Sequence, residues 1–148
     1  MTLHLGIRNA LDIIDTARIL RVLNATNVVL QRIGIERPRV AVSGINPHAS
    51  EDGLFGSEEA EIILPAIEKA RAAGIDANGP FGADTMYLDK NFDAYVVMYH
   101  DQGHIPAKLV GFDGTAAFAI GTPLLFSSVA HWNWASSLRE HRIPFHPR

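Results

Sequence analysis

Short apolar runs that are typical of strands alternate along this chain with segments of helical periodicity. Residues 39–44 (RVAVSG) and 94–99 (AYVVMY) are such runs, and residues 15–34 and 57–74 carry apolar side chains at helical spacing. Alternating strands and helices favour a sheet with parallel pairing that is covered by helices. We therefore expect an α/β fold, and nothing in the chain reads as a repeat or a linker.

Turn and capping residues set the expected ends of these elements. The expected helices cover residues 15–34, 57–74 and 83–88, and the expected strands cover residues 40–42, 75–78, 94–99 and 115–120. Ser57 is the expected N-cap of the second helix, because glutamates fill the first turn that follows it. Pro65 lies inside that helix and predicts a kink. The run Asn78–Gly79–Pro80 predicts a turn, and residues 45–56 predict a loop.

Composition excludes several classes of protein. The chain has 148 residues, 47% of them hydrophobic and 20% charged, which suits one domain with a core. The net charge of −3 and the lack of a basic stripe argue against a nucleic-acid partner. The absence of cysteine excludes disulfides and thiolate zinc sites. No apolar run is long enough to span a membrane, and residues 1–20 do not resemble a signal peptide. We expect a cytoplasmic protein with no membrane partner.

Three histidines occupy positions that a metal site would use. His48 and His100 each follow a strand-like run, and ligands of open α/β sheets bind outside the carboxyl ends of the strands. With His4 they would make a set of three imidazoles with open positions, as in catalytic metal sites. The alternative is that they are ordinary loop or cap histidines. Asp101 could orient the ring of His100 or could cap a helix.

Two further side chains are candidates for substrate chemistry. Lys108 lies in an otherwise apolar run, where it could hold an anionic substrate or donate a proton, or could simply be a surface lysine. Asp84 follows a glycine- and proline-containing turn and could contact a hydroxyl group or cap a helix. The loop before Ser57 opens onto a helix N-terminus, which favours a phosphate or carboxylate. It matches neither a Walker loop nor the dinucleotide fingerprint.

Several stretches together resemble the C-terminal half of the 4-hydroxythreonine-4-phosphate dehydrogenase family of vitamin B6 biosynthesis. The matching segments, in family order, are MTLHL, VAVSGINPHASEDGLFGSEE, NGPFGADT, VVMYHDQGHIPAKLVGF and IGTPLLFSSVAH. They cover nearly all of the chain from Thr2 to His131. The combination is far more specific than any one of its motifs.

The resemblance implies a fold and a chemistry. The fold is a three-layer α/β/α arrangement with a mostly parallel sheet, here incomplete relative to the two-domain homodimers of the family. A divalent metal (Zn, Co, Mg or Mn) would be held by His4, His48 and His100, shared across the dimer. The reaction would use NAD or NADP to oxidise, and then decarboxylate, a phosphorylated 3-hydroxy acid such as 4-phosphohydroxy-L-threonine. Asp84, Asp101 and Lys108 match residues of the active site, with Lys108 binding substrate and donating a proton.

Some positions depart from the family pattern. Ala117, Phe126 and Ala130 stand where the family usually has asparagine, arginine and aspartate. Loss of a guanidinium from an anion site removes a charge-assisted contact worth about 1.5–3 kcal/mol. We therefore expect a changed substrate. The form HDQGHIPAK, with His104 and Ile105, resembles the branch of the family that acts on related acids such as threonate or erythronate 4-phosphate or a dihydrodiol carboxylate. The alternative is an inactive remnant that binds metal or dimerises.

The chain divides into two parts by its match to the family. Residues 1–131 form the α/β region, and residues 132–148 (WNWASSLREHRIPFHPR) form an atypical tail. The tail lacks the small-residue run and helix that the family has there. We expect it to reflect a frameshift or a truncated reading frame, the alternative being a genuine divergent tail. The family also continues upstream for about as many residues again.

Overall fold

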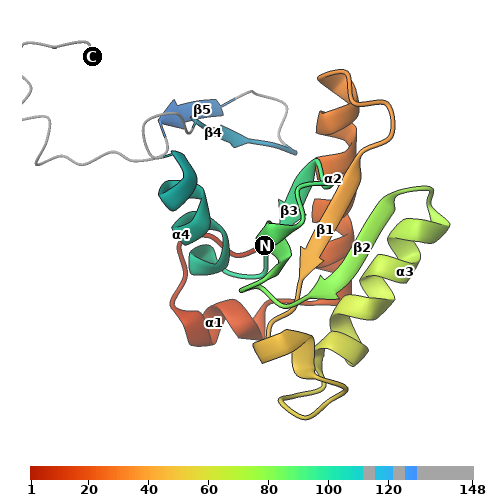
Figure 1. Cartoon of the computed structure of the whole chain (residues 1–148), viewed down its shortest axis with the longest axis vertical. Coiled ribbons are helices and arrows are strands. Elements are labelled where there is room, and N and C mark those ends of the chain that lie inside the picture. Colours follow the sequence, from red (N-terminus) through yellow and green to blue (C-terminus); the bar gives the residue numbers. More distant parts are fainter. Residues whose placement is uncertain (112–115, 122–125, 130–148) are drawn as a thin grey trace, which may run out of the picture.

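A three-stranded parallel sheet lies at the centre of the molecule (Figure 1). The computed structural model describes residues 1–111, 116–121 and 126–129. Strand β1 (Arg39–Ser43) is the middle strand and pairs in parallel with β2 (Asp76–Phe81) and β3 (Ala94–Val96). Every residue of β1 after Arg39 is buried, as expected for a central strand of an α/β sheet. The predicted α/β class with parallel pairing is confirmed.

Helices α2 (Thr16–Arg32) and α3 (Leu64–Ala72) build the core against this sheet. The Asp15 side chain accepts a hydrogen bond from the Arg18 amide at 2.6 Å and caps the start of α2. The fully buried core side chains come from both helices, the segment before α3, the sheet and the turn after β3: Ile19, Leu23, Val40, Val42, Ile63, Ala66, Ile67, Ala70, Ala77 and Met98. The helix predicted over residues 15–34 is therefore confirmed.

The second predicted helix is divided near its proline. Residues Glu59–Ile63 form a π-helical segment (η2), and α3 begins at Leu64 with Pro65 in its first turn. Proline lacks an N–H and its ring clashes with the preceding turn, so a regular α-helix cannot run through it unchanged. The predicted kink at Pro65 stays a prediction, and the change that the structure has there is from π-helical to α-helical geometry. The predicted N-cap at Ser57 is wrong: Glu58 holds that position without a side-chain cap bond, and the Ser57 carbonyl accepts from the Glu61 amide at 2.9 Å.

The turn predicted at residues 78–80 is also wrong, because β2 continues through it to Phe81. The Gly79–Pro80 peptide is cis, and Gly79 has a φ of +130°. A β-carbon at Gly79 would lie 2.5 Å from the Val42 carbonyl oxygen. The register between β1 and β2 shifts between Ala41 and Ser43. Glycine and proline therefore mark a bulge inside the strand rather than its end.

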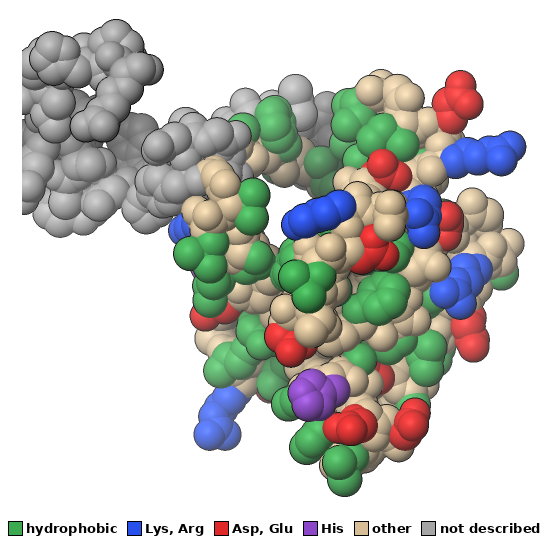
Figure 2. Space-filling view, in the orientation of Figure 1, with side chains coloured by type: hydrophobic (Ala, Val, Ile, Leu, Met, Phe, Trp, Pro, Cys, Tyr) green, Lys and Arg blue, Asp and Glu red, His purple; other side chains and the backbone are tan. Residues whose placement is uncertain are grey.

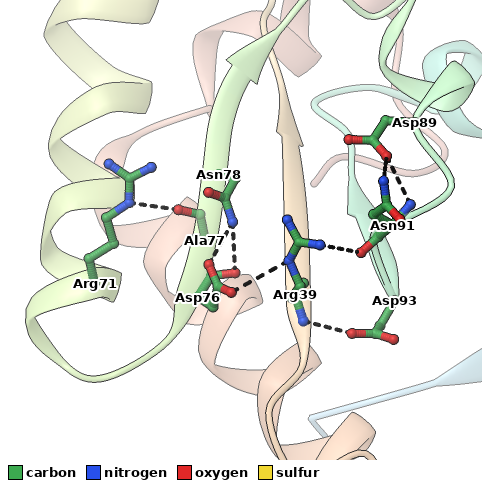
Figure 3. Close-up of polar contacts among 8 residues, drawn as sticks. All are labelled: Arg39, Arg71, Asp76, Ala77, Asn78, Asp89, Asn91 and Asp93. Atoms are coloured by element: carbon green, nitrogen blue, oxygen red, sulfur yellow. Dashed lines mark hydrogen bonds and ion pairs between the residues drawn. The ribbon is translucent and has the colours of Figure 1, made fainter.

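Polar contacts join the amino ends of the strands (Figure 3). The Arg39 amide donates to the Asp93 carboxylate at 2.8 Å, and its guanidinium donates to the Asn91 carbonyl at 3.1 Å. Its Nε also lies 3.7 Å from the Asp76 carboxylate. One arginine thus links β1 to the starts of both neighbouring strands.

Two helices that the periodicity did not predict lie apart from α2 and α3, on the β3 side of the sheet (Figure 1). They are α1 (Ile7–Asp12) and α4 (His100–Gly111). The predicted strand over residues 94–99 therefore ends early, at Val96, and α4 follows after a short turn. The amino terminus is held beside this turn, since its ammonium donates to the Val97 carbonyl at 2.9 Å. Burial, with a smaller contribution from Arg18, lowers the pKa of that ammonium.

The strand predicted over residues 115–120 is present but belongs to a second sheet. Strand β4 (Ala116–Ala119) pairs antiparallel with β5 (Phe126–Val129). Default parallel pairing was wrong for this segment, because parallel strands need a long crossover and these two are close in sequence. The short helix predicted over residues 83–88 is a 3₁₀ turn, η3 (Met86–Leu88). Ala130 and residues 132–148 lie outside the described residues.

Candidate metal and substrate site

The carboxyl ends of β1 and β3 carry two of the three predicted metal ligands. His48 lies in a 3₁₀ turn, η1 (Pro47–Ser50), just after β1, and His100 is the first residue of α4, just after β3. A pocket of about 610 Å³ opens at this edge. It is lined by Ile45, Asn46, Pro47, His48, Ala83, Asp84, Tyr87, Tyr99, Asp101, Gln102, Ile105, Pro106 and Leu109. The predicted location of the site is thus matched by a pocket that contains Asp84 and Asp101.

A second pocket of about 410 Å³ lies next to the first. It is lined by Thr2, Leu5, Ile7, Ala10, Tyr99, His100 and Asp101. Tyr99 and Asp101 line both pockets, so they form the wall between the His48 side and the His100 side. The rest of the second pocket is lined by residues of the amino-terminal segment and of α1.

His4 and His100 come together although 95 residues separate them in the sequence. Their ring centres lie 5.8 Å apart. With Zn–N bonds of about 2 Å, two imidazoles on one ion place their ring centres roughly 5–6 Å apart. His104, one turn further along α4, stacks on His100 with ring centres 4.2 Å apart and planes 16° apart. Burial first, then the nearby His100, Lys108 and His4, lowers the pKa of His104.

Carboxylates hold one nitrogen of His48 and one of His100. The Nδ1 of His100 lies 2.8 Å from the Asp101 carboxylate, and the Nδ1 of His48 lies 3.2 Å from that of Glu51. When a carboxylate holds Nδ1–H, the other ring nitrogen, Nε2, is left as a neutral lone-pair donor. This arrangement fits the donor chemistry of a divalent metal. It also supports the predicted orienting role of Asp101 over a pure capping role.

The three histidines do not meet within one chain. No group of three or more His, Asp or Glu side chains in the described part of the chain is arranged to hold a metal ion. His4 and His100 face each other, whereas His48 contacts Glu51 and, edge to face, Phe55 at 6.0 Å between ring centres. A site shared between two subunits, as the resemblance implies, stays a prediction.

The turn that carries His48 has an unusual backbone. Five successive residues, 48–52, have φ values of 52°, 52°, 76°, 45° and 55°, and none of them is glycine. The left-handed conformation costs about 1–2 kcal/mol per residue for an L-amino acid with a side chain. Contacts from outside the turn must therefore hold it, and the Ser50 hydroxyl, which donates to the Gly56 carbonyl, is one of them.

Two buried polar side chains that sequence reasoning missed contact the carboxyl end of β1. Glu59 is 3% exposed and accepts from the amides of Ile45 and Asn46. Gln102 is 8% exposed and bonds to Ser43, Gly44 and Met98. The only sequence signal for them was their position, in the first turn of a helix that follows a loop.

The three predicted catalytic side chains have different positions. Asp84 and Asp101 line the larger pocket. Lys108 lies on α4 one turn beyond His104 and lines neither of the two pockets formed by described residues. Tyr87, which was not predicted, lines the larger pocket, and its hydroxyl donates to the Gln102 carbonyl at 2.6 Å. Burial, with a smaller contribution from Tyr95, raises the pKa of Tyr87 to about 12.

The two departures from the family pattern that the structure describes lie on the second sheet. Ala117, in β4, is exposed and pairs with Ser128, and the backbone of Phe126, in β5, pairs with Ala119. Acidic and basic side chains are interspersed over the visible described surface (Figure 2). None of the described helices is long and apolar enough to cross a membrane.

Most of this chain matches known proteins in sequence. The family model described as "Pyridoxal phosphate biosynthetic protein PdxA" matches residues 1–133. A D-threonate 4-phosphate dehydrogenase of Salmonella typhimurium is 46% identical over 131 residues, or 86% of this chain and 40% of the relative. A 1,2-dihydroxy-3,5-cyclohexadiene-1,4-dicarboxylate dehydrogenase of Comamonas is 43% identical, over 88% of this chain and 42% of the relative.

A solved structure gives the same match in three dimensions. The crystal structure of a 4-hydroxythreonine-4-phosphate dehydrogenase from Klebsiella pneumoniae superposes with a TM-score of 0.83 at 43% identity. The superposition covers 88% of this chain and 40% of that one. The chain therefore spans less than half the length of the relatives that it matches.

Proposed function

The chain belongs to the family of the pyridoxal phosphate biosynthetic protein PdxA, and on that premise we propose that it supplies the metal-binding edge of a dehydrogenase. The reaction is the oxidation of a secondary alcohol in a phosphorylated hydroxy acid, with NAD or NADP as the hydride acceptor. One observation carries the proposal: His48 and His100, each with Nδ1 held by a carboxylate, flank adjacent pockets at the carboxyl edge of the sheet.

Each group of this edge has a role in the proposed reaction. His4, His48 and His100 would hold a divalent ion, which when bound supplies positive charge beside the substrate oxygens. Asp101 and Glu51 keep the rings of His100 and His48 oriented. Asp84 and Asp101 line the pocket and are the candidate acceptors of the hydroxyl proton. Bound NAD or NADP would supply the hydride acceptor, and a 3-oxo acid formed in this way could then lose CO₂. Lys108 is a candidate proton donor for that second step.

The substrate we propose is a sugar-acid phosphate of the D-threonate 4-phosphate kind. The names of the relatives cover several acids, which include hydroxythreonine phosphate, threonate phosphate and a cyclic dihydrodiol dicarboxylate. Ala117 and Phe126 replace a polar and a cationic residue of the usual family pattern, so a changed substrate is favoured. Reduction of NAD and of NADP, followed at 340 nm with each acid, tests this. Faster turnover of 4-phosphohydroxy-L-threonine than of D-threonate 4-phosphate would contradict it.

The second candidate function is a module that binds metal without turnover. The observation that favours it is that His4 and His100 face each other, whereas Lys108, the candidate proton donor, lines neither of the two pockets formed by described residues. Such a module would bind Zn²⁺ through the same histidines but would reduce neither NAD nor NADP with any of the three acids. Activity of the purified chain with any one acid would exclude it.

Metal binding itself is tested by titration of the purified chain with Zn²⁺ in a calorimeter. We expect His48→Ala and His100→Ala each to weaken binding by about 10–100-fold or to abolish it. His146→Ala, outside the segment that matches the family, is the control and should leave the affinity unchanged. Equal affinities for all variants would refute the proposed site.

A further inference from the structure

We infer that Glu59 and Gln102 are the positioning residues of this site, which hold the His48 turn and the His100 helix to one strand end. The inference rests on the proposed function only in taking these two histidines as metal ligands. Neither positioning side chain contacts His48 or His100 through any hydrogen bond of the described residues; each acts through the backbone that carries the histidine.

Glu59 holds the start of the His48 loop. One of its carboxylate oxygens accepts from the Ile45 amide at 2.7 Å and from the Asn46 amide at 2.8 Å. The other accepts from the Asn46 side-chain amide at 2.9 Å. A carboxylate that is 3% exposed is tolerated only where hydrogen bonds replace water. Glu59 therefore fixes both backbone amides relative to η2, the π-helical segment that precedes α3.

The loop folds closely over this carboxylate. A β-carbon at Gly44 would lie 2.9 Å from the Glu59 carboxylate and 2.9 Å from the Ala49 α-carbon. No side chain therefore fits between the strand end and the turn. The run of left-handed residues begins at His48, two residues after Asn46, which is the last residue that Glu59 holds. Glu59 thus sets the point and direction from which the strained turn leaves the strand.

Gln102 holds the start of the His100 helix to the same strand. Its amide oxygen accepts from the Ser43 hydroxyl at 3.1 Å and from the Met98 amide at 2.9 Å. Its amide nitrogen donates to the Gly44 carbonyl at 2.9 Å. Only a side chain with both an acceptor and a donor can make this set, so glutamine is matched where glutamate or leucine is not. The bond to Met98 also fixes the three-residue path from β3 to His100.

The two sets of bonds meet at residues 43–46, directly at the end of β1. This common attachment places His48 relative to His100, although the two side chains lie on separate segments and line different pockets. A loss of either attachment should move one histidine and leave the sheet and the other histidine in place. That selectivity distinguishes a positioning role from a general contribution to stability.

Hydrogen exchange of single amides, measured by NMR on the full chain without metal, tests the inference. Glu59→Met, which keeps length but removes both acceptors, should raise exchange at Ile45 and Asn46 by at least about tenfold and leave Met98 unchanged. Gln102→Met should do the reverse, raising exchange at Met98 alone. Glu59→Gln keeps one acceptor oxygen and should restore part of the protection. Glu58→Met is the matched control, because the Glu58 carboxylate bonds to the Asn46 side chain at 2.7 Å and to the backbone of Ser57 and Glu58, and not to the amides of Ile45, Asn46 or Met98 among described residues.

Zinc titration of the same variants gives the second measurement. Glu59→Met and Gln102→Met should each weaken Zn²⁺ binding by about 10–100-fold, with Glu59→Gln between Glu59→Met and the wild type. A uniform rise in exchange across the sheet, or unchanged exchange at the named amides, would overturn the inference. If the wild type binds no zinc, the proposed function fails, and the exchange data still decide the positioning role. If Glu59→Met does not fold, Glu59→Gln and Gln102→Met carry the test.

Discussion

The two ends of the parallel sheet are both held by polar side chains, but in opposite environments. At the amino ends, the Arg39 side chain pairs with Asp76, and the Arg39 backbone amide donates to Asp93. The side chains of Arg39 and Asp76 are about half exposed, at 48% and 54%. At the carboxyl ends, Glu59 and Gln102 are almost completely buried. Exposed ion pairs contribute little because water competes for both partners, whereas a buried polar group that loses its partner bears the full cost of desolvation. Polar contacts at the two ends therefore contribute very differently to stability, and the larger contribution comes from the end beside the candidate site.

The largest expected effect is at Glu59. We expect Glu59→Ala to lower the free energy of unfolding by about 3 kcal/mol, because buried amides left without an acceptor cost about 1–3 kcal/mol each and water recovers part of this. Urea unfolding followed by circular dichroism measures the change. If Glu59→Ala lowered the free energy of unfolding by less than Asp76→Ala does, the carboxyl end would contribute less to stability than the amino end, contrary to this comparison.

The next effect is at Gln102. Gln102→Leu should cost about 2 kcal/mol, since the Gly44 carbonyl and the Met98 amide lose their partner inside the protein. Ser43→Ala and the double variant complete a mutant cycle with the same unfolding measurement. The Ser43 hydroxyl bonds directly to Gln102, so the two losses should fall short of additivity. Strict additivity would mean that the two residues do not act together.

A smaller effect appears at alkaline pH. The hydroxyl of Tyr87 is protonated in the folded chain up to about pH 12, whereas an unfolded tyrosine ionises near its ordinary pKa of 10.0. The folded state then binds more protons than the unfolded state, so stability is fully present below pH 10 and falls as the pH rises from 10 toward 12. The slope should be well under ~1.4 kcal/mol per pH unit, because solvent screens a half-buried phenol.

Urea unfolding at pH 9 and pH 11 measures this slope, and Tyr87→Phe should reduce it. Phenolate absorbance of the folded chain supplies an independent check, since Tyr87 should be among the last tyrosines to ionise. An identical slope in wild type and Tyr87→Phe would show that other groups cause the loss.

The smallest effect is expected at the amino ends of the strands. Asp76→Ala should change the free energy of unfolding by no more than about 0.5 kcal/mol, because the 3.7 Å pair with Arg39 is exposed on both sides. The same unfolding experiment in low and high salt checks it. A change as large as that of Gln102→Leu would show that exposure does not govern the difference between the two ends.

Much of the fold followed from local signals. The periodicity of residues 15–34 and the apolar run at residues 39–44 predicted α2 and β1, because burial of one helix face or of a whole central strand leaves a repeating pattern. The signals failed where tertiary contacts override them. Gly79 and Pro80 are ordinary turn residues, yet β2 continues through them because pairing with β1 outweighs their local preference.

For the site, the sequence by itself determined which chemical groups are available. His4, His48, His100 and Asp101 were found from residue type and from motifs that are contiguous in the chain. Only the tertiary structure decided which of these groups meet, bringing His4 to His100 and leaving His48 on the other side of Tyr99 and Asp101. The roles of Glu59 and Gln102 could not be predicted from the sequence, because a hydrogen bond between residues 14, 58 or 59 positions apart produces no periodic pattern in a single sequence.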